Sequence, residues 1–122
     1  MRILIVDDEL DILTIVSTFL KDRGYDVVTA SNGDDALKVV NANSDVGLVL
    51  LDVVMPGRSG IDTLKELMRL DPKPHVIMMT ARADEKIFEA VRLGAVDYVL
   101  KPIDFEALAA TTAASFKRSD AS

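Results

Sequence analysis

The sequence predicts an α/β domain in which a parallel sheet carries helices on both faces. Short apolar runs, typical of buried strands, alternate five times with stretches whose apolar residues recur at helical spacing. This alternation requires parallel strands joined by right-handed helical crossovers. The central run, residues 48–51, leads directly into the carboxylate of Asp52, and Pro56 and Gly57 then end the pattern. An apolar run without alternation predicts a strand that is buried on both faces.

The first part of the chain contains two predicted strand–helix units before the central strand. Residues 3–6 are aliphatic and form the first predicted strand. Apolar residues at helical spacing follow over residues 12–20, and Gly24 is a typical residue just beyond a helix C-terminus. A second strand is expected over residues 25–30, a turn over residues 31–33, and a short helix around residues 36–40.

Three more helices and two more strands are predicted after Asp52. Apolar residues over 61–68 mark a helix that ends before Pro72, and residues 75–79 form an apolar strand. The next helix lies between Asp84 and Gly94, with apolar residues at 87, 88 and 91. A short strand over 97–100 and a last helix over about 105–116, with Asp104 at its N-cap, complete the pattern.

Length and composition restrict the class of protein. The chain has 122 residues, of which 49% are hydrophobic, so we expect one folded domain over residues 1–122 with its last few residues disordered. It has no cysteine, which excludes disulfides and thiolate metal sites. No apolar run approaches the roughly 20 residues that span a bilayer. The net charge of −6 argues against binding to a nucleic-acid backbone. We therefore expect a soluble, cytoplasmic domain.

Polar residues follow four of the predicted strands, at their carboxyl ends. Asp7 and Asp8 follow the first strand, Asp52 the third, Thr80 the fourth and Lys101 the fifth. The carboxyl ends of parallel strands share one edge of the sheet, where α/β proteins bind ligands. Carboxylates that converge there repel one another unless a cation binds, and oxygen ligands of this kind suit Mg²⁺. With a lysine and a hydroxyl, the set suits a transferred phosphoryl group and makes Asp52 a candidate nucleophile.

Each of these residues also has a simpler interpretation. The acids at 7–9 could only favour the N-terminus of the first helix, and Asp52 could accept backbone hydrogen bonds in a turn. Thr80 alone would be a turn residue, and Lys101 alone a solvated charge. All of these interpretations would have to hold at the same edge of the sheet, so we favour a functional site. His75 and the methionines at 78 and 79 are expected to belong to a strand and to the core.

The sequence resembles the response-regulator receiver domains of bacterial two-component signalling from residue 3 to about residue 116. Four segments carry the resemblance, in this order and spacing: Val6-Asp7-Asp8-Glu9, residues 52–60 (DVVMPGRSG), Thr80-Ala81, and residues 94–102 (GAVDYVLKP). The resemblance implies a flavodoxin-like sheet with strand order 2-1-3-4-5. It also implies a switch that accepts a phosphoryl group from a histidine kinase or phosphotransfer protein and acts on a downstream effector.

The resemblance also implies roles for individual residues. Asp52 would be the phosphoacceptor, Asp8 a direct Mg²⁺ ligand and Asp7 a ligand through water, with the backbone carbonyl of Val54 completing the protein ligands. Lys101 and Thr80 would contact the phosphoryl oxygens. Tyr98 would be the aromatic that changes rotamer on activation, and the Lys101–Pro102 bond would be cis. Such a domain catalyses only its own phosphorylation and dephosphorylation. It would signal through the face formed by the fourth helix, fifth strand and fifth helix.

Two other functions each require a residue pattern that this chain lacks, and the last helix lacks the basic residues of one known type of dimer. A phosphatase of the haloacid dehalogenase type needs a second acid two residues after its nucleophile, and position 54 is valine. A flavin-binding electron carrier needs a Ser/Thr-rich loop after the first strand, and this chain has Asp7-Asp8-Glu9. The last helix has no basic residue before Lys117, so we do not expect the charged-pair dimer that receivers of transcription factors often form on that face.

Overall fold

The protein contains the predicted parallel sheet, as seen in a computed structural model. The structure describes residues 2–121, with side chains as far as Phe116. We expected disorder in the last few residues of the chain, and this expectation stays a prediction. The elements follow one another as β1 (Arg2–Val6), α1 (Leu10–Asp22), β2 (Asp26–Ala30), α2 (Gly33–Ala42), β3 (Val46–Asp52), α3 (Gly60–Leu67), β4 (His75–Thr80), α4 (Glu85–Leu93), β5 (Asp97–Leu100) and α5 (Phe105–Ala121).

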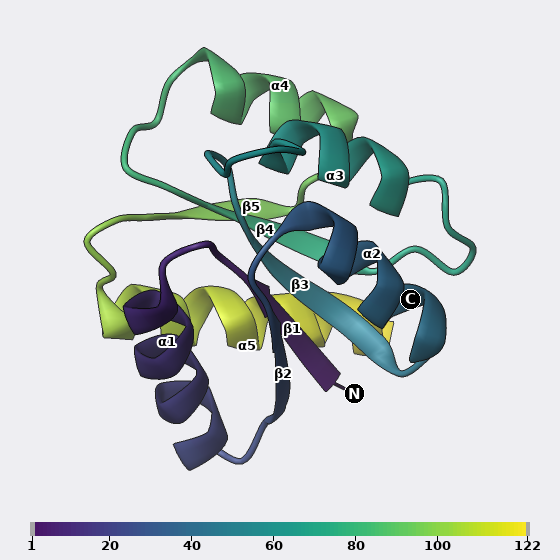
Figure 1. Ribbon diagram of the computed structural model, residues 1–122. Helices are drawn as coiled ribbons and strands as arrows, with labels where there is room; N and C mark the ends of the chain where they lie inside the picture. The colour runs from purple at the N-terminus through teal and green to yellow at the C-terminus, as the bar shows by residue number, and fades with distance from the viewer. Residues whose placement is uncertain (1, 122) are drawn as a thin grey trace.

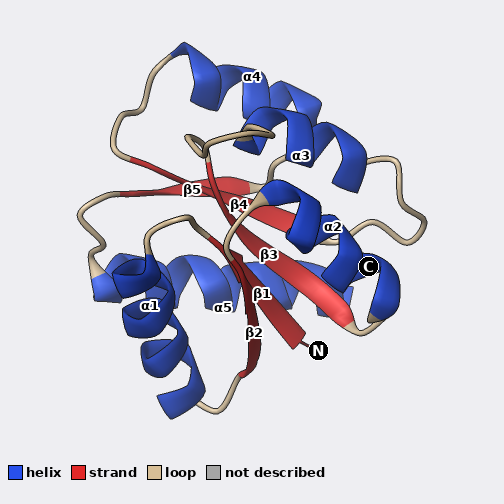
Figure 2. Cartoon of the chain, in the orientation of Figure 1, coloured by secondary structure: helices blue, strands red, loops and turns tan. Residues whose placement is uncertain are grey.

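The sheet separates two layers of helices (Figures 1 and 2). Its strands are parallel and lie in the order β2-β1-β3-β4-β5, which confirms the expected topology. Helices α1 and α5 cover one face, while α2, α3 and α4 cover the other. No helix in the described part of the chain is long and apolar enough to span a membrane.

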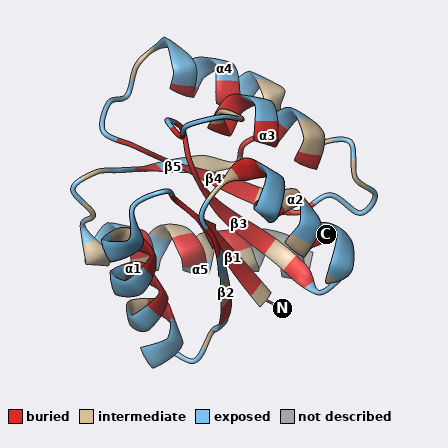
Figure 3. Cartoon of the chain, in the orientation of Figure 1, coloured by how far each residue is buried: buried red, intermediate tan, exposed pale blue. Residues whose placement is uncertain are grey.

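Strand β3 lies at the centre of the sheet and contributes to both apolar cores. Leu50 packs with the residues under α1 and α5, and Leu51 packs with those under α2, α3 and α4. Figure 3 shows this arrangement as buried strands beneath helices whose outer surfaces are exposed. Met78 and Met79 divide in the same way, as expected for core residues. The apolar run over 48–51 lacks alternation because both of its faces are covered.

The helix ends follow the predicted capping residues. Asp84 accepts a hydrogen bond from the Lys86 backbone N–H, and Asp104 accepts two, from Glu106 and Ala107. Gly24 and Gly94 end α1 and α4 with φ of +92° and +124°, a region that residues with a Cβ rarely occupy. These caps fix the lengths of the helices and so the places where the chain returns to the sheet.

Helix α4 lies between Asp84 and Gly94 as predicted, but it buries only one of the three apolar residues that marked it. Ile87 is buried together with Ala90, but Phe88 and Val91, two of the residues that marked this helix, are 66% and 51% exposed. The sequence placed three apolar residues in the helix without showing which of them face the sheet. The result is an apolar surface on α4 that no part of the described chain covers.

Candidate functional site

Strand register brings Asp7 and Asp52 side by side. Val6 is the register partner of Leu51, so the residues that follow them leave neighbouring strands at the same edge. Asp7 is fully buried and Asp52 only 4% exposed, whereas Asp8 is exposed. One carboxylate oxygen from each of the three lies within 4.8 Å of the others. The three acids predicted from the sequence therefore form one cluster.

The backbone orients both buried carboxylates. Oδ1 of Asp7 accepts the Glu9 N–H at 2.9 Å, and Oδ1 of Asp52 accepts the Val54 N–H at 3.3 Å. The simpler role of turn acceptor is therefore real, but it occupies only one oxygen of each carboxylate. The second oxygen of each faces Lys101.

Lys101 reaches the cluster from the end of β5. Its Nζ lies 2.8 Å from Oδ2 of Asp7 and 3.4 Å from Oδ2 of Asp52, with Glu9 Oε1 at 3.8 Å. The Lys101 backbone N–H donates to the Thr80 carbonyl at 2.7 Å, and the Lys101–Pro102 bond is cis, as the resemblance implies. One ammonium group thus contacts three carboxylates.

The charges of the cluster are not balanced. Burial, together with the negative charge of Asp7, raises the pKa of Asp52 to about 6, although Lys101 and the Val54 N–H act in the opposite direction. Burial alone would lower the pKa of Lys101, but its hydrogen bond to Asp7 and the charge of Asp52 outweigh burial and raise it. The cluster therefore has too little positive charge, and a further cation would relieve the repulsion.

The donor set fits Mg²⁺. Its atoms are carboxylate oxygens, two from buried residues and one from a residue open to solvent, and Mg²⁺ binds to one or two carboxylates while keeping several waters. Thiolate is absent from the chain, and its single histidine, His75, begins β4, far along the strand from this edge. Mg²⁺ therefore suits this set better than Zn²⁺ does.

The Thr80 hydroxyl is engaged in a local turn, and Tyr98 lies at the edge of the sheet. The Thr80 hydroxyl donates to the Arg82 carbonyl at 3.0 Å and accepts the Arg82 N–H at 3.2 Å. Tyr98 pairs with Met78, two register positions before Thr80, and its side chain is partly exposed at the edge of the sheet. The structure therefore brings together Asp7, Asp8, Asp52 and Lys101, and it keeps the Thr80 hydroxyl in a local turn.

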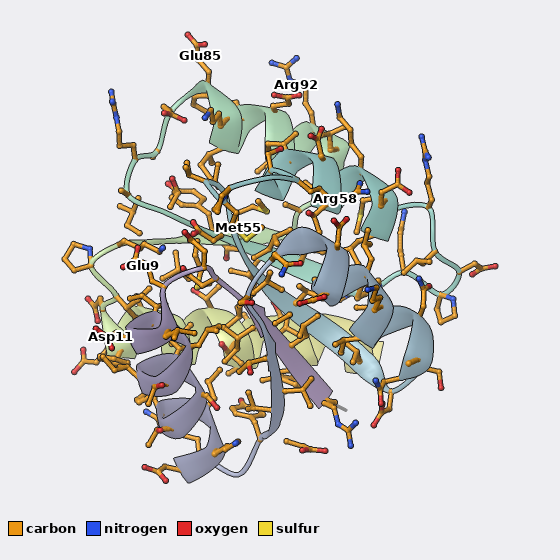
Figure 4. The ribbon with its side chains drawn as sticks, viewed as in Figure 1. Glu9, Asp11, Met55, Arg58, Glu85 and Arg92 are labelled. Atoms are coloured by element: carbon orange, nitrogen blue, oxygen red, sulfur yellow. The ribbon has the colours of Figure 1, made fainter. Side chains whose placement is uncertain are left out.

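Two features of the loop after Asp52 were not predicted. A Cβ at Gly60 would overlap the Asp52 carbonyl oxygen and lie 2.8 Å from Val53 Cα, so only glycine lets α3 begin so close to β3. Arg58, labelled in Figure 4, donates from Nε to Asp34 of α2 at 2.8 Å and holds the other side of this loop. In the sequence, Gly60 could be recognised only as a residue that favours a turn. The ion pair between Arg58 and Asp34 could not be predicted, because it depends on how closely α2 approaches α3.

A parallel sheet with a buried acid cluster and a lysine at its carboxyl edge defines a class of α/β domain, and comparison with known proteins gives the family. Residues 3–113 match the family model described as the response regulator receiver domain. The chain belongs to this family, as the resemblance implies.

Relatives and solved structures agree with this assignment. The chain is 44% identical over 110 residues to the transcriptional regulatory protein ZraR of Escherichia coli K12, covering 89% of this chain and 25% of that protein. It is 39% identical to CpxR of the same organism, covering 97% of this chain and 50% of that protein. The chain thus spans a quarter to a half of the length of these relatives.

Solved receiver structures share the fold along their whole length. The receiver domain of NtrX from Brucella abortus aligns with a TM-score of 0.88 at 32% identity, covering 94% of this chain and 98% of that one. The chemotaxis protein CheY4 of Vibrio cholerae aligns with a TM-score of 0.88 at 30% identity, with coverage of 93% and 97%.

Proposed function

We propose that this receiver domain is a Mg²⁺-dependent switch that accepts a phosphoryl group on Asp52. The observation that carries the proposal is the convergence of Asp7, Asp8, Asp52 and Lys101 at one edge of the sheet. Oδ2 of Asp52 is the candidate nucleophile because Oδ1 accepts the Val54 N–H. Attack of this oxygen on a phosphodonor would form an aspartyl phosphate and release the donor's leaving group.

The residues around Asp52 have separate tasks in this proposal. Asp7, Asp8, Asp52 and the Val54 carbonyl would hold Mg²⁺, which supplies positive charge to the phosphoryl oxygens. Lys101, already 3.4 Å from Asp52, would neutralise another of these oxygens. The Thr80 hydroxyl would exchange its turn partner, Arg82, for the phosphoryl group.

The remaining parts of the proposal concern partners and place. The phosphodonor would be a histidine kinase or a phosphotransfer protein. A downstream effector would recognise the phosphorylated domain by binding to the face formed by α4, β5 and α5. The domain would catalyse only its own phosphorylation and dephosphorylation, in the cytoplasm, without binding nucleic acid or membrane. The alternative phosphatase function lacks a second acid, because position 54 is an exposed valine.

Intact mass spectrometry after incubation with acetyl phosphate tests the proposal. With Mg²⁺ the native chain should gain one phosphoryl group, and without Mg²⁺ it should gain almost none. Asp52→Asn should gain none under either condition. A matched variant, Asp62→Asn, removes an exposed acid of α3 and should behave as the native chain does. Equal labelling of native protein and Asp52→Asn would exclude Asp52 as the acceptor.

A further inference from the structure

The loop that leads from β3 to α3 carries a proposed metal ligand, the backbone carbonyl of Val54. We call residues 53–59 the acceptor loop. Within it, Met55 is buried in the core under α2, α3 and α4. Where the loop enters α3, the Gly60 N–H donates to the Val53 carbonyl at 3.1 Å. The core therefore holds the inner side of the acceptor loop, and its outer side depends on other contacts.

Arg58 connects the outer side of the acceptor loop to α2. Its Nε donates to Oδ1 of Asp34 at 2.8 Å. Its methylene stem lies against the first residue of α2, since a Cβ at Gly33 would be 3.0 Å from Cδ of Arg58. The same Cβ would overlap Oγ1 of Thr63 in α3, so a glycine is needed where α2, α3 and the loop meet. Figure 4 shows Arg58 at this meeting point.

The amino end of α2 also adjoins the strand end that carries the other acids. Strand β2, which leads into α2, pairs with β1, and the Ala30 carbonyl at its end accepts the Asp7 N–H at 3.2 Å. Two residues later, Asn32 caps α2 by accepting the Asp35 N–H at 2.8 Å. The start of α2 is therefore fixed relative to Asp7. Through Arg58, it also fixes the acceptor loop relative to Asp7.

We propose that Arg58 is a positioning residue, which through its ion pair to α2 keeps the acceptor loop where the Val54 carbonyl and Asp7 can bind the same Mg²⁺ ion. The inference rests on the proposed function, because it concerns the metal that would serve phosphorylation there. Among the described side chains, Arg58 pairs with Asp34 and with none of the acid cluster, so it acts through the loop. Mg²⁺ requires near-octahedral geometry with oxygen ligands at about 2.0–2.1 Å, so displacing one ligand lowers the affinity.

Positioning and simple electrostatics predict opposite effects of removing Arg58. Its positive charge lies on the loop that carries a metal ligand, so by charge alone its loss would strengthen the binding of a cation. Loss of positioning would weaken this binding instead. The side chains of Arg58 and Asp34 are 36% and 67% exposed, and exposed ion pairs contribute little. The expected increase in the Mg²⁺ dissociation constant is therefore about two- to fivefold.

NMR titration of the unphosphorylated full chain with Mg²⁺ tests the inference. Arg58→Ala and Asp34→Ala should each raise the dissociation constant about two- to fivefold. The double variant should raise it no further, because both changes remove the same contact. Arg69→Ala is the matched control: it removes the same charge from the exposed pair with Glu66, so it should not weaken Mg²⁺ binding. Circular dichroism should show that all variants remain folded.

Backbone ¹⁵N relaxation of the metal-free chain gives a second measurement. Order parameters at residues 54, 55 and 57 should fall in Arg58→Ala and stay native in Arg69→Ala. Unchanged order parameters in Arg58→Ala would overturn the inference. So would Mg²⁺ affinity in Arg58→Ala equal to or above that of the native chain, additive losses in the double variant, or an equal loss in Arg69→Ala. These outcomes leave the proposed function intact, whereas a native chain that binds no Mg²⁺ would overturn both.

Discussion

The ionisation of Asp52 links the chemistry of single residues to the stability of the domain. Its pKa is about 6 in the folded protein and 3.8 for a free aspartate, so between these pH values the folded state binds more protons than the unfolded state does. Metal-free protein should therefore lose stability as pH rises through this window and level off above it. The loss is about 2–3 kcal/mol at most, from about 1.4 kcal/mol per pKa unit.

Replacing Asp52 tests this dependence. In the absence of divalent metal, Asp52→Asn should flatten the curve between about pH 4 and pH 6, and at pH 7 it should be more stable than the native chain by about 1–3 kcal/mol. Urea unfolding at a series of pH values measures both quantities. Asp22→Asn, at an exposed acid away from the cluster, should keep the native slope. A native slope in Asp52→Asn would mean that another group titrates in this window.

Val54 and Arg82 are expected to set the lifetime of the phosphorylated state. Val54, two residues after Asp52, is 66% exposed and offers no side-chain hydrogen bond to an attacking water. Arg82 is exposed in the loop that begins at Thr80 and is long enough to cover the approach. A Val54→Asn, Arg82→Glu double variant should lose its phosphoryl group several-fold faster than the native chain. Decay followed by intact mass should show this, and an unchanged rate would refute the role of these two side chains.

At the scale of elements, the junction between β3 and α3 should tolerate no side chain at Gly60. Gly60→Ala should lower the free energy of unfolding by at least about 3 kcal/mol, because its Cβ would overlap backbone atoms. Gly57→Ala is the matched control in the same loop: its φ is +75° but nothing lies within 4 Å of the added Cβ. It should cost only about 1 kcal/mol. Chemical unfolding measures both, and equal losses would show that the junction relaxes.

The β4–α4 loop determines how phosphorylation would reach Tyr98. A hydrogen bond from Thr80 to a charged phosphoryl oxygen is worth about 1.5–3 kcal/mol, but the two bonds to Arg82 must first be given up at about 0.5–1.5 kcal/mol each. The net gain is at most about 2 kcal/mol, which shifts a two-state equilibrium by no more than about thirtyfold. The unphosphorylated protein should therefore already populate the active state measurably.

NMR with a beryllofluoride adduct on Asp52 examines this coupling. Thr80→Ala should still accept the adduct but show much smaller shift changes around Tyr98 than the native chain does. Thr29→Ala, on the distant edge strand β2, should give native shift changes. If Thr80→Ala also gives native changes near Tyr98, the signal does not pass through the Thr80 hydroxyl.

At the scale of the whole molecule, we expect the acid cluster to make the stability of the domain depend on divalent cations. Mg²⁺ should raise the melting temperature by mass action, because it binds the folded chain, in which the three carboxylates are assembled. Asp8→Ala should remove most of this increase, since it takes away the exposed carboxylate of the cluster. Asp11→Ala, an exposed acid on α1, should keep the increase. Calorimetry with and without Mg²⁺ gives the comparison, and an undiminished increase in Asp8→Ala would place the ion elsewhere.

The sequence carries the topology and the acid cluster because both depend on strands. The apolar run before Asp52 and the order of strands and helices identify the sheet edge at which Asp7, Asp52 and Lys101 meet. The orientation of α4 could not be obtained in this way, because Phe88 and Val91 are apolar whether or not they face the sheet. The turn at Thr80 could not be predicted either, since the sequence does not show that the Arg82 backbone would hydrogen-bond to the Thr80 hydroxyl.

The stack of Tyr25 on Phe116 has a practical consequence for spectroscopy. The chain contains two tyrosines and no tryptophan, so its near-ultraviolet emission comes from tyrosine. The Tyr25 ring lies 5.0 Å from the Phe116 ring, nearly parallel to it, between α1 and β2 on one side and α5 on the other. In Tyr25→Phe the only remaining tyrosine would be Tyr98, at the edge of the sheet. The domain therefore contains its own optical probe for the environment of β5, readable without an attached dye.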